Sequence, residues 1–221
     1  ITNIFSIKKK LKTSFDYVVN LGGYIDHASF QEGGQKIILE HFLSVQYLIK
    51  ILSRKSLKKF IQIGTSHEYG MAPAPQNENL KESPISPYSF AKVASTYFLK
   101  AIHKTENFPF TILRLFLTYG PGQGKNRFLP EIINKCLKNK KFPTSHGKQL
   151  RDFCYIDDTV RAILISLTSK KANGKIFNVA SGKPKRISSV IKQVVSIVGK
   201  GKPIFGKRKD ISENMALYAN I

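Results

Sequence analysis

Short runs rich in β-branched and aromatic residues alternate along this chain with longer segments in which apolar residues recur every three or four positions. Four of these runs are predicted strands, at residues 15–22, 59–65, 110–119 and 175–180. Such alternation is typical of βαβ units, whose parallel strands lie buried beneath helices. The pattern therefore predicts an α/β protein built on a parallel sheet.

The spacing of apolar residues predicts helices at 35–53, 87–103, 128–139, 157–168 and 187–198. The first helix has an apolar face formed by Ile38, Phe42, Val45, Leu48, Ile49 and Leu52. The second begins at Ser86, a good N-cap residue, and Pro87, which suits the first helical position. Its apolar stripe consists of Phe90, Val93, Ala94, Tyr97, Phe98 and Ala101. The tail after Gly199 is expected to be a loop.

Size and cysteine content limit the class of protein. With 221 residues, 42% of them hydrophobic, the chain can bury the core of one domain. No apolar run approaches the roughly 20 residues that cross a bilayer, and no secretory signal opens the sequence, so we expect a cytoplasmic protein without a membrane partner. Cys136 and Cys154 form no C-x-x-C pair, which indicates neither a disulfide framework nor a metal site.

The formal net charge of +22 raises the alternative of a non-catalytic basic protein that binds nucleic acid. Of the 36 basic residues, however, 29 are lysines spread along the chain, without the interleaved aromatic residues of single-strand binders. That alternative depends on charge alone, so no nucleic-acid partner is expected. A basic surface does favour small anionic substrates through its long-range field.

Tyr88 and Lys92 form a Y-x-x-x-K pair at the start of the helix predicted at 87–103, where residues four apart share a face. With nine tyrosines and 29 lysines, about one such pair arises by chance, so the pair alone proves nothing. The preceding strand supplies the context, because it ends at Thr65 and α/β sheets bind ligands at the carboxyl ends of their strands. A phenol has a pKa of about 10, and a neighbouring ammonium would help it to act as a base.

In context, these segments resemble the active site of extended short-chain dehydrogenases/reductases, the NAD-dependent epimerase/dehydratase family that acts on nucleotide sugars. The resemblance is carried by GTSHEYG (64–70), SPYSFAK (86–92), ILRLFLTYGPGQ (112–123), QLRDFCYIDD (149–158) and KIFNVASG (175–182). This collinear order, from Phe15 to the end, is much harder to obtain by chance than any one motif. It implies a Rossmann-like, doubly wound parallel sheet.

The resemblance also implies catalytic and cofactor-binding residues. Thr65 would hydrogen-bond the reacting sugar oxygen, and Tyr88 would exchange its proton as the general acid/base. Lys92 would bind the nicotinamide ribose and lower the Tyr88 pKa. The cofactor, NAD or NADP, would lie against Tyr88, Lys92 and the small turn made by Leu21, Gly22 and Gly23.

Arg151 matches the arginine that binds the substrate diphosphate, for which a planar fork of donors is well suited. The alternative for Arg151 is a structural ion pair with Asp152 or Asp157. Asp157 and Asp158 are better interpreted as the cap of the next helix than as catalytic carboxylates. No residue is assigned to a metal.

Two departures from the family pattern narrow the expected chemistry. In the family's dehydratases an acidic pair, or an acid two residues on, follows the threonine, and here Ser66 and His67 occupy those places. Glu68 comes one position later, where an extended segment would point it the other way unless a turn intervenes. Because these places hold no acid, dehydration is disfavoured. The second departure is Leu117, which stands where the family often has an asparagine that contacts the substrate phosphate, so the resemblance gives little support for phosphate contacts at this strand.

The sequence contains no G-x-x-G-x-x-G after an N-terminal strand, because its first predicted strand resembles the fourth of this fold. The glycine-rich turn at 120–124 fits a substrate-side loop better than a pyrophosphate cradle. We therefore expect a chain truncated at both ends that forms one partial NAD(P)-binding domain over 1–221. Its substrate-binding parts are expected mainly in 121–155 and 181–221.

The leading hypothesis is an NAD(P)-dependent enzyme that transfers a hydride between nicotinamide and a sugar carbon of a nucleoside-diphosphate sugar. Within it, reduction of a 4-keto sugar comes first, epimerisation second and 4,6-dehydration third. The alternative of another class is an inactive fragment or a basic binding protein. Relatives commonly pair through the helices placed here at 35–53 and 87–103, which implies a homodimer.

Overall fold

The computed structural model describes residues 14–26, 28–208 and 214–221, and the chain divides into two compact units. The first unit comprises the residues up to Ala72, together with Glu78–Leu115 and Val160–Val179. The second comprises Pro73–Asn77, Phe116–Thr159 and Ala180–Ile221. Each unit has a hydrophobic core of its own.

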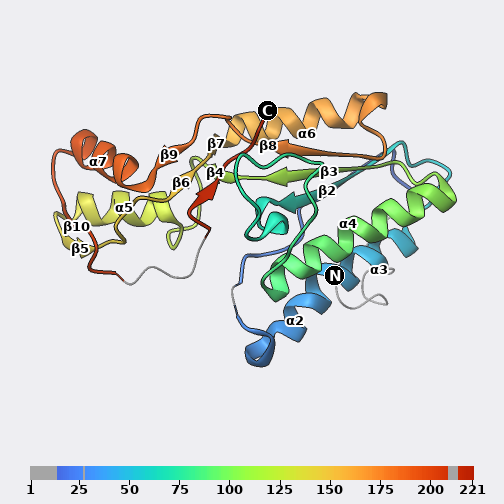
Figure 1. Cartoon of the computed structure of the whole chain (residues 1–221). Coiled ribbons are helices and arrows are strands. Elements are labelled where there is room, and N and C mark those ends of the chain that lie inside the picture. Colours follow the sequence, from blue (N-terminus) through green and yellow to red (C-terminus); the bar gives the residue numbers. More distant parts are fainter. Residues whose placement is uncertain (1–13, 27, 209–213) are drawn as a thin grey trace. The chain divides into compact units, whose positions relative to one another are not determined.

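A four-stranded parallel sheet forms the centre of the first unit, in the order β1, β2, β3, β8 (Figure 1). Its strands are β1 (Tyr17–Asn20), β2 (Lys59–Thr65), β3 (Phe110–Leu115) and β8 (Lys175–Val179). The register places Gln62 of β2 between Asn20 of β1 and Ile112 of β3. The α/β class and the parallel sheet predicted from the sequence are therefore confirmed.

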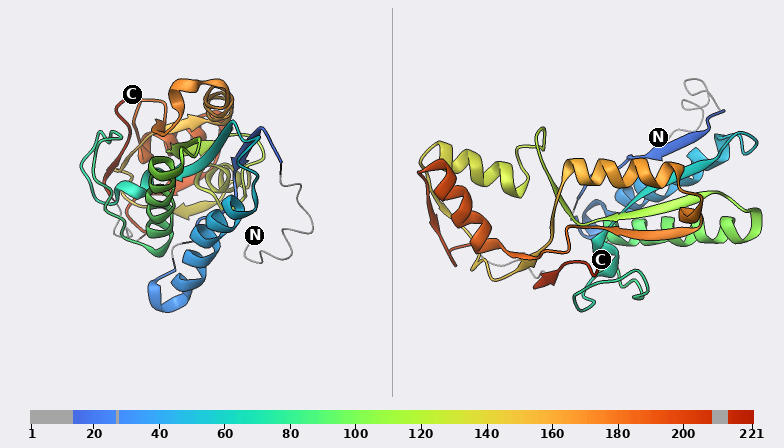
Figure 2. Two further views of the ribbon diagram at one scale, coloured as in Figure 1. Left: turned by 90° about the vertical axis from the view of Figure 1, so that its right-hand side faces the viewer. Right: turned by 90° about the horizontal axis from the view of Figure 1, so that it is seen from above.

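Helices cover both faces of this sheet. One face carries α2 (Gln35–Ile38), α3 (Ser44–Ile51) and α4 (Pro87–Glu106), and α4 lies beside the α2 to α3 segment (Figure 2). The other face carries α6 (Ile156–Thr168), whose residues from Val160 onward belong to this unit. The core between the sheet, α3 and α4 contains Val45, Leu48, Ile49, Phe60, Leu99 and Ile112.

The helix predicted at 35–53 is less regular than its apolar spacing suggests. A π-helical turn, η2 (Leu39–Leu43), separates α2 from α3, and the segment η1 (Phe30–Gly34), which precedes α2, is kinked at Glu32 and Gly33. Spacing of three and four residues does not distinguish a continuous α-helix from one with a wide turn, because both keep a buried face.

The start of α4 is as predicted, since the Ser86 side chain accepts the Ser89 N–H and Pro87 is the first helical residue. The predicted apolar stripe of α4 is wrong, however. Phe90 and Tyr97 are 44% and 50% exposed. The buried face consists of Pro87, Tyr88, Ser89, Ala91, Lys92, Ser95, Thr96, Leu99 and Ile102. Its polar members can be buried because they find hydrogen-bond partners, which apolar spacing cannot reveal.

The strand predicted at 110–119 is two strands. β3 ends at Leu115, and β4 (Leu117–Tyr119) pairs in parallel with β7 (Phe153–Tyr155) in the second unit. The tail is also more ordered than expected, because β10 (Lys202–Ile204) pairs with β5 (Lys141–Pro143). Very short strands are set by their partners, so local propensity gives little sign of them.

The second unit is built around two helices that pack on each other. They are α5 (Phe128–Leu137) and α7 (Ile187–Val198), and their shared core contains Ile132, Cys136, Phe142, Ile191 and Val194. The strand β6 (Leu150–Arg151) lies between β11 (Ala216–Leu217) and β9 (Lys185–Arg186). Within residues 14–26, 28–208 and 214–221, no helix has the length and apolar character that spanning a bilayer requires.

Candidate active site

Thr65 is the last residue of β2 and begins a tight turn. Its side-chain oxygen accepts a hydrogen bond from the His67 backbone N–H at 3.3 Å, and the next residues form the short 3-10 helix η3 (Ser66–Tyr69). A threonine hydroxyl has one proton and two acceptor positions. Because the oxygen acts here as an acceptor, its proton can be donated to another oxygen.

Glu68 fixes this turn from inside the protein. Its carboxylate accepts the Thr65 backbone N–H at 2.9 Å and the Thr96 hydroxyl at 2.9 Å. It also pairs with Arg114 at 3.0 Å, and both charged side chains are fully buried. The segment after Thr65 is therefore a turn rather than an extended strand. The carboxylate is held by donors from β2, α4 and β3, so Glu68 is a structural group.

The helix α4 brings Lys92 and Tyr88 to the end of β2. Nζ of Lys92 donates to the Ile63 carbonyl at 3.1 Å and lies 5.8 Å from the centre of the Tyr88 ring. The Tyr88 ring in turn lies 6.4 Å from that of His67, two residues beyond Thr65. The structure thus brings Tyr88 and Lys92 together with the turn that Thr65 begins.

The Lys92 ammonium is 6% exposed, and this burial lowers its pKa to about 8, although the charge of Glu68 opposes the change. A lysine with this pKa is still mostly charged at pH 7. It therefore supplies positive charge beside the Tyr88 ring at neutral pH.

His41 was not predicted as a site residue. Its ring lies in edge-on contact with that of Tyr88, with centres 5.2 Å apart, and 5.0 Å from that of Tyr24. Burial, followed by the charge of Lys92, lowers the His41 pKa to about 4, so the imidazole is neutral at pH 7. The sequence offers only its spacing, since His41 comes four residues after Ile37 and four before Val45. The structure shows that both of these residues are buried, so His41 lies on the buried side of this segment.

The turn after β1 contains the three residues predicted to contact the cofactor. Leu21 is 67% exposed, and the Gly22 N–H donates to the Asn20 side chain at 3.0 Å. Gly23 has a φ of +139°, which favours glycine, and a Cβ there would lie 2.7 Å from the His41 ring and 3.4 Å from Nζ of Lys92. Of the three, Gly23 is thus the one placed against both His41 and Lys92.

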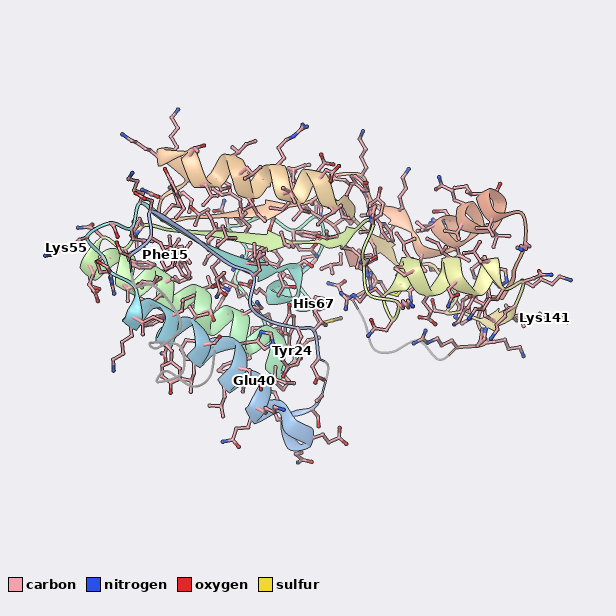
Figure 3. The ribbon with its side chains drawn as sticks, turned by 180° about the vertical axis from the view of Figure 1, so that it is seen from behind. Phe15, Tyr24, Glu40, Lys55, His67 and Lys141 are labelled. Atoms are coloured by element: carbon pink, nitrogen blue, oxygen red, sulfur yellow. The ribbon has the colours of Figure 1, made fainter. Side chains whose placement is uncertain are left out.

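Tyr24 continues this turn, and its hydroxyl donates to the carboxylate of Glu40 on η2. The hydrogen bond to the Glu40 anion raises the Tyr24 pKa to about 12. Tyr24, Glu40 and His67 lie at one end of the first unit, whereas Phe15 and Lys55, which precede β1 and β2, lie at the other (Figure 3). The site is therefore at the carboxyl ends of the parallel strands, where this class of sheet binds ligands.

Arg151 belongs to the second unit, on β6, where Nη1 donates to the Leu150 carbonyl at 2.9 Å. The neighbouring Asp152 carboxylate accepts the Ser181 N–H and hydroxyl, both at 2.6 Å, and the Gly182 N–H at 2.9 Å. Asp152 thus holds the turn after β8. Asp157 and Asp158 lie in the first turn of α6, where negative charge complements the helix dipole.

A parallel α/β sheet that gathers a threonine, a tyrosine and a buried lysine at the carboxyl ends of its strands places this protein among the α/β proteins that bind ligands at that edge. More specifically, the chain belongs to the NAD dependent epimerase/dehydratase family, whose model matches residues 1–180. The resemblance noted from the sequence motifs is thereby confirmed.

Two curated relatives illustrate the similarity. The chain is 29% identical over 200 residues to a dTDP-D-glucose 4,6-dehydratase of Dictyostelium discoideum, covering 84% of this chain and 46% of the relative. It is 26% identical over 204 residues to a UDP-glucuronate 4-epimerase of Thermodesulfobacterium geofontis, covering 90% and 62%. The chain spans about half the length of the curated relatives it matches.

Solved structures agree with this assignment. The UDP-glucuronic acid 4-epimerase from Bacillus cereus, in complex with UDP-glucuronic acid and NAD, is 28% identical with a TM-score of 0.86, covering 99% of this chain and 69% of that one. RMD from Pseudomonas aeruginosa, complexed with NADPH, is 19% identical with a TM-score of 0.88, covering 99% and 77%. The second similarity supports the fold alone.

Proposed function

We propose that this chain carries the catalytic residues of an NAD(P)-dependent enzyme that transfers a hydride between nicotinamide and a carbon of a nucleoside-diphosphate sugar. The overall reaction proposed is reduction of a 4-keto sugar or epimerisation. One observation carries the proposal: the buried Lys92 ammonium, bonded to β2, lies beside the Tyr88 ring where β2 ends at Thr65.

The side chains at this site fit a nicotinamide cofactor. Lys92 uses one of its three N–H donors on the Ile63 carbonyl, which leaves donors for the ribose hydroxyls. Gly23 has no side chain where the turn approaches Lys92. Buried His41 adds two ring nitrogens that have no hydrogen-bond partner among the residues that the structure describes. We assign the cofactor to the region bounded by Lys92, Tyr88 and the turn at residues 21–23, with Leu21 and Gly22 as flanking contacts.

In the proposed mechanism, a nicotinamide held by Lys92, Tyr88 and the turn at residues 21–23 would supply or accept the hydride. Thr65 donates its hydroxyl proton in a hydrogen bond to the reacting sugar oxygen and fixes its position. The Tyr88 hydroxyl gives a proton to that oxygen during reduction and takes one during oxidation. Lys92 binds the ribose and, as a nearby cation, favours the Tyr88 phenolate. Epimerisation would use the same residues in both directions.

The buried position of the Glu68 carboxylate supports reduction or epimerisation over dehydration. Dehydration needs a further group that removes a proton from the sugar, and Glu68 is the carboxylate nearest to Thr65 in the sequence. Its oxygens are already occupied by Thr65, Thr96 and Arg114, and its side chain is fully buried. The similarity to 4,6-dehydratases keeps dehydration as the second candidate.

We further propose that Arg151 binds the diphosphate of the substrate. β6 holds the residue by its backbone, and the guanidinium offers the paired donors that suit phosphate oxygens.

A homodimer is proposed as well. The exposed apolar residues of α4, Phe90 and Tyr97, support pairing with a second copy of this chain through that face.

The test is turnover of purified protein with a 4-keto-6-deoxy sugar nucleotide and with UDP-glucuronic acid, followed by cofactor absorbance and by product stereochemistry. Consumption of reduced cofactor with the keto sugar supports the reductase. Interconversion of the C4 isomers without net cofactor consumption supports the epimerase. Formation of a 4-keto-6-deoxy product from a dTDP-hexose would instead establish the dehydratase.

A further inference from the structure

The imidazole of His41 is enclosed by three elements of the first unit. It belongs to η2, contacts the Tyr88 ring of α4, and lies against Gly23 and Tyr24 in the turn after β1. Its side chain is 3% exposed, and neither ring nitrogen has a hydrogen-bond partner within the described residues. Buried polar groups almost always have a partner, so an unpaired imidazole calls for an explanation.

The position of Gly23 shows how close this ring is to Lys92. A Cβ built on Gly23 would lie 2.8 Å from Nδ1 of His41 and 3.4 Å from Nζ of Lys92. The two nitrogens are therefore separated by no more than the sum of these distances. The Tyr24 carbonyl also approaches the ring and slightly favours its protonated form, but without hydrogen-bond geometry.

The two side chains offer complementary hydrogen bonds. The ammonium of Lys92 can only donate, whereas a neutral imidazole has one donor nitrogen and one acceptor nitrogen. A single hydroxyl can accept from an ammonium and donate to an imidazole. Two adjacent hydroxyls allow each side chain to hold one of them, so a sugar diol also matches this pair of side chains.

We propose that His41 is a ligand-binding residue, one of whose ring nitrogens hydrogen-bonds a hydroxyl of a sugar diol while Lys92 holds the neighbouring hydroxyl. This inference depends on the proposed function, which supplies two sources of such a diol. One is the nicotinamide ribose of the cofactor, and the other is the sugar of the nucleotide sugar. The position of His41 beside Gly23 and Lys92 favours the ribose.

The experiment is an NMR titration of protein labelled with ¹³C and ¹⁵N at histidine. NAD+ and UDP-glucuronic acid are added in separate samples, and the His41→Phe variant assigns the His41 signals. We expect NAD+ to shift these signals. His103 serves as the internal control, because its Nδ1 lies 2.8 Å from the Phe108 carbonyl in a structural contact, and its signals should not move.

Two variants then give binding constants by calorimetry. The His41→Phe variant keeps a flat ring but has no polar atom, and we expect it to weaken NAD+ binding about five- to tenfold. The His41→Gln variant keeps a donor and an acceptor and should bind within about threefold of the unmodified protein. Because phenylalanine removes the unpaired nitrogens, the melting temperature of the ligand-free His41→Phe variant should not fall.

The outcomes separate this inference from the proposed function. If a probe binds while the His41 signals stay in place and phenylalanine leaves its affinity unchanged, the His41 assignment is wrong and the function stands. If UDP-glucuronic acid alone shifts the signals, the diol is that of the substrate. If neither probe binds the unmodified chain, both proposals fail. A lower melting temperature of His41→Phe with unchanged affinity would overturn the inference in favour of a structural water on the ring.

Discussion

The carboxylate of Glu68 and the guanidinium of Arg114 lie 3.0 Å apart with both side chains fully buried, directly behind the turn that begins at Thr65. Glu82 adds a second carboxylate to Arg114, and Arg114 lies over the Tyr69 ring at 4.7 Å. Burial would raise the Glu82 pKa, but Arg114 outweighs it and the Glu82 pKa is lowered. The positive charge thus stabilises two acids that would otherwise be costly to bury.

Replacing Glu68 by alanine should destabilise the protein strongly. The change leaves Arg114 paired with Glu82 but removes the acceptor of the Thr65 N–H and of the Thr96 hydroxyl, so we expect a loss of about 3 kcal/mol. Urea unfolding measures it. The control is Arg54→Ala, which removes a solvent-exposed pair with Glu106 at 2.8 Å and should cost under about 1 kcal/mol. Equal effects of both substitutions would contradict the structural role of Glu68.

Replacing Tyr88 by phenylalanine should separate binding from catalysis. We expect the affinity for NAD+ to change little and kcat to fall by about a hundredfold or more, because the proton carrier is lost. Stopped-flow turnover and calorimetry measure the two effects. Tyr17→Phe, on an exposed strand position of the same unit, is the matched control. Full activity of Tyr88→Phe would refute the assigned proton donor.

The stability of the first unit should fall as the pH drops from about 6.5 towards 4. The His41 pKa is lowered from 6.5 to about 4 in the folded protein, so in this range the unfolded chain binds more protons. The contribution of neutral His41 to the free energy of unfolding is fully present above pH 6.5. It is lost progressively as the pH falls towards 4, by roughly 3 kcal/mol at most.

Urea unfolding at a series of pH values tests this dependence, with His41→Gln as the control that removes the titrating group. The free energy of unfolding of the variant should depend less on pH between 6.5 and 4.5. This range lies above the ordinary pKa of 4.5 for Glu82, so protonation of that carboxylate does not dominate it. Indistinguishable profiles for the two proteins would show that His41 titrates normally.

Arg151→Lys should weaken the binding of UDP-glucuronic acid roughly tenfold while retaining the charge, because lysine lacks the paired donors of the guanidinium. Binding by the unmodified protein should depend only modestly on salt. A steep salt dependence that is unaffected by this substitution would support the alternative of a nucleic-acid binding protein. Calorimetry at several salt concentrations distinguishes the two cases.

A glutamate at Phe90 or Tyr97 should prevent self-association, since either places a charge on the exposed face of α4. Analytical ultracentrifugation should then show a monomer where the unmodified protein is a dimer. Ile197→Glu, at a 77% exposed position of α7, introduces the same charge in the second unit and should leave the dimer intact. A dimer that survives both α4 substitutions would place the interface elsewhere.

Much of the architecture follows from patterns that act locally. The strand ending at Thr65 and the helix beginning at Pro87 could be placed to the residue, because an apolar run and a capping sequence define them. The buried face of α4 could not, since Lys92 and Thr96 are tolerated inside only through partners on β2 and η3. Their burial depends on tertiary contacts that no local pattern contains.

The candidate site also combines residues that local sequence patterns indicate with residues that only tertiary contacts reveal. Tyr88 and Lys92 could be identified by their spacing and by the motifs around them. His41 could not, because a histidine among apolar residues looks like any other interruption of a stripe. Glu68 was difficult for a different reason: the path of the chain after Thr65 depends on a capping turn whose own stability comes from the Glu68 carboxylate.

The Thr65 hydroxyl oxygen accepts the His67 N–H at the point where β2 ends, and this bond leaves the hydroxyl proton available for a second hydrogen bond. Valine at this position would lose the fold of the turn and the proton together, whereas serine would keep both.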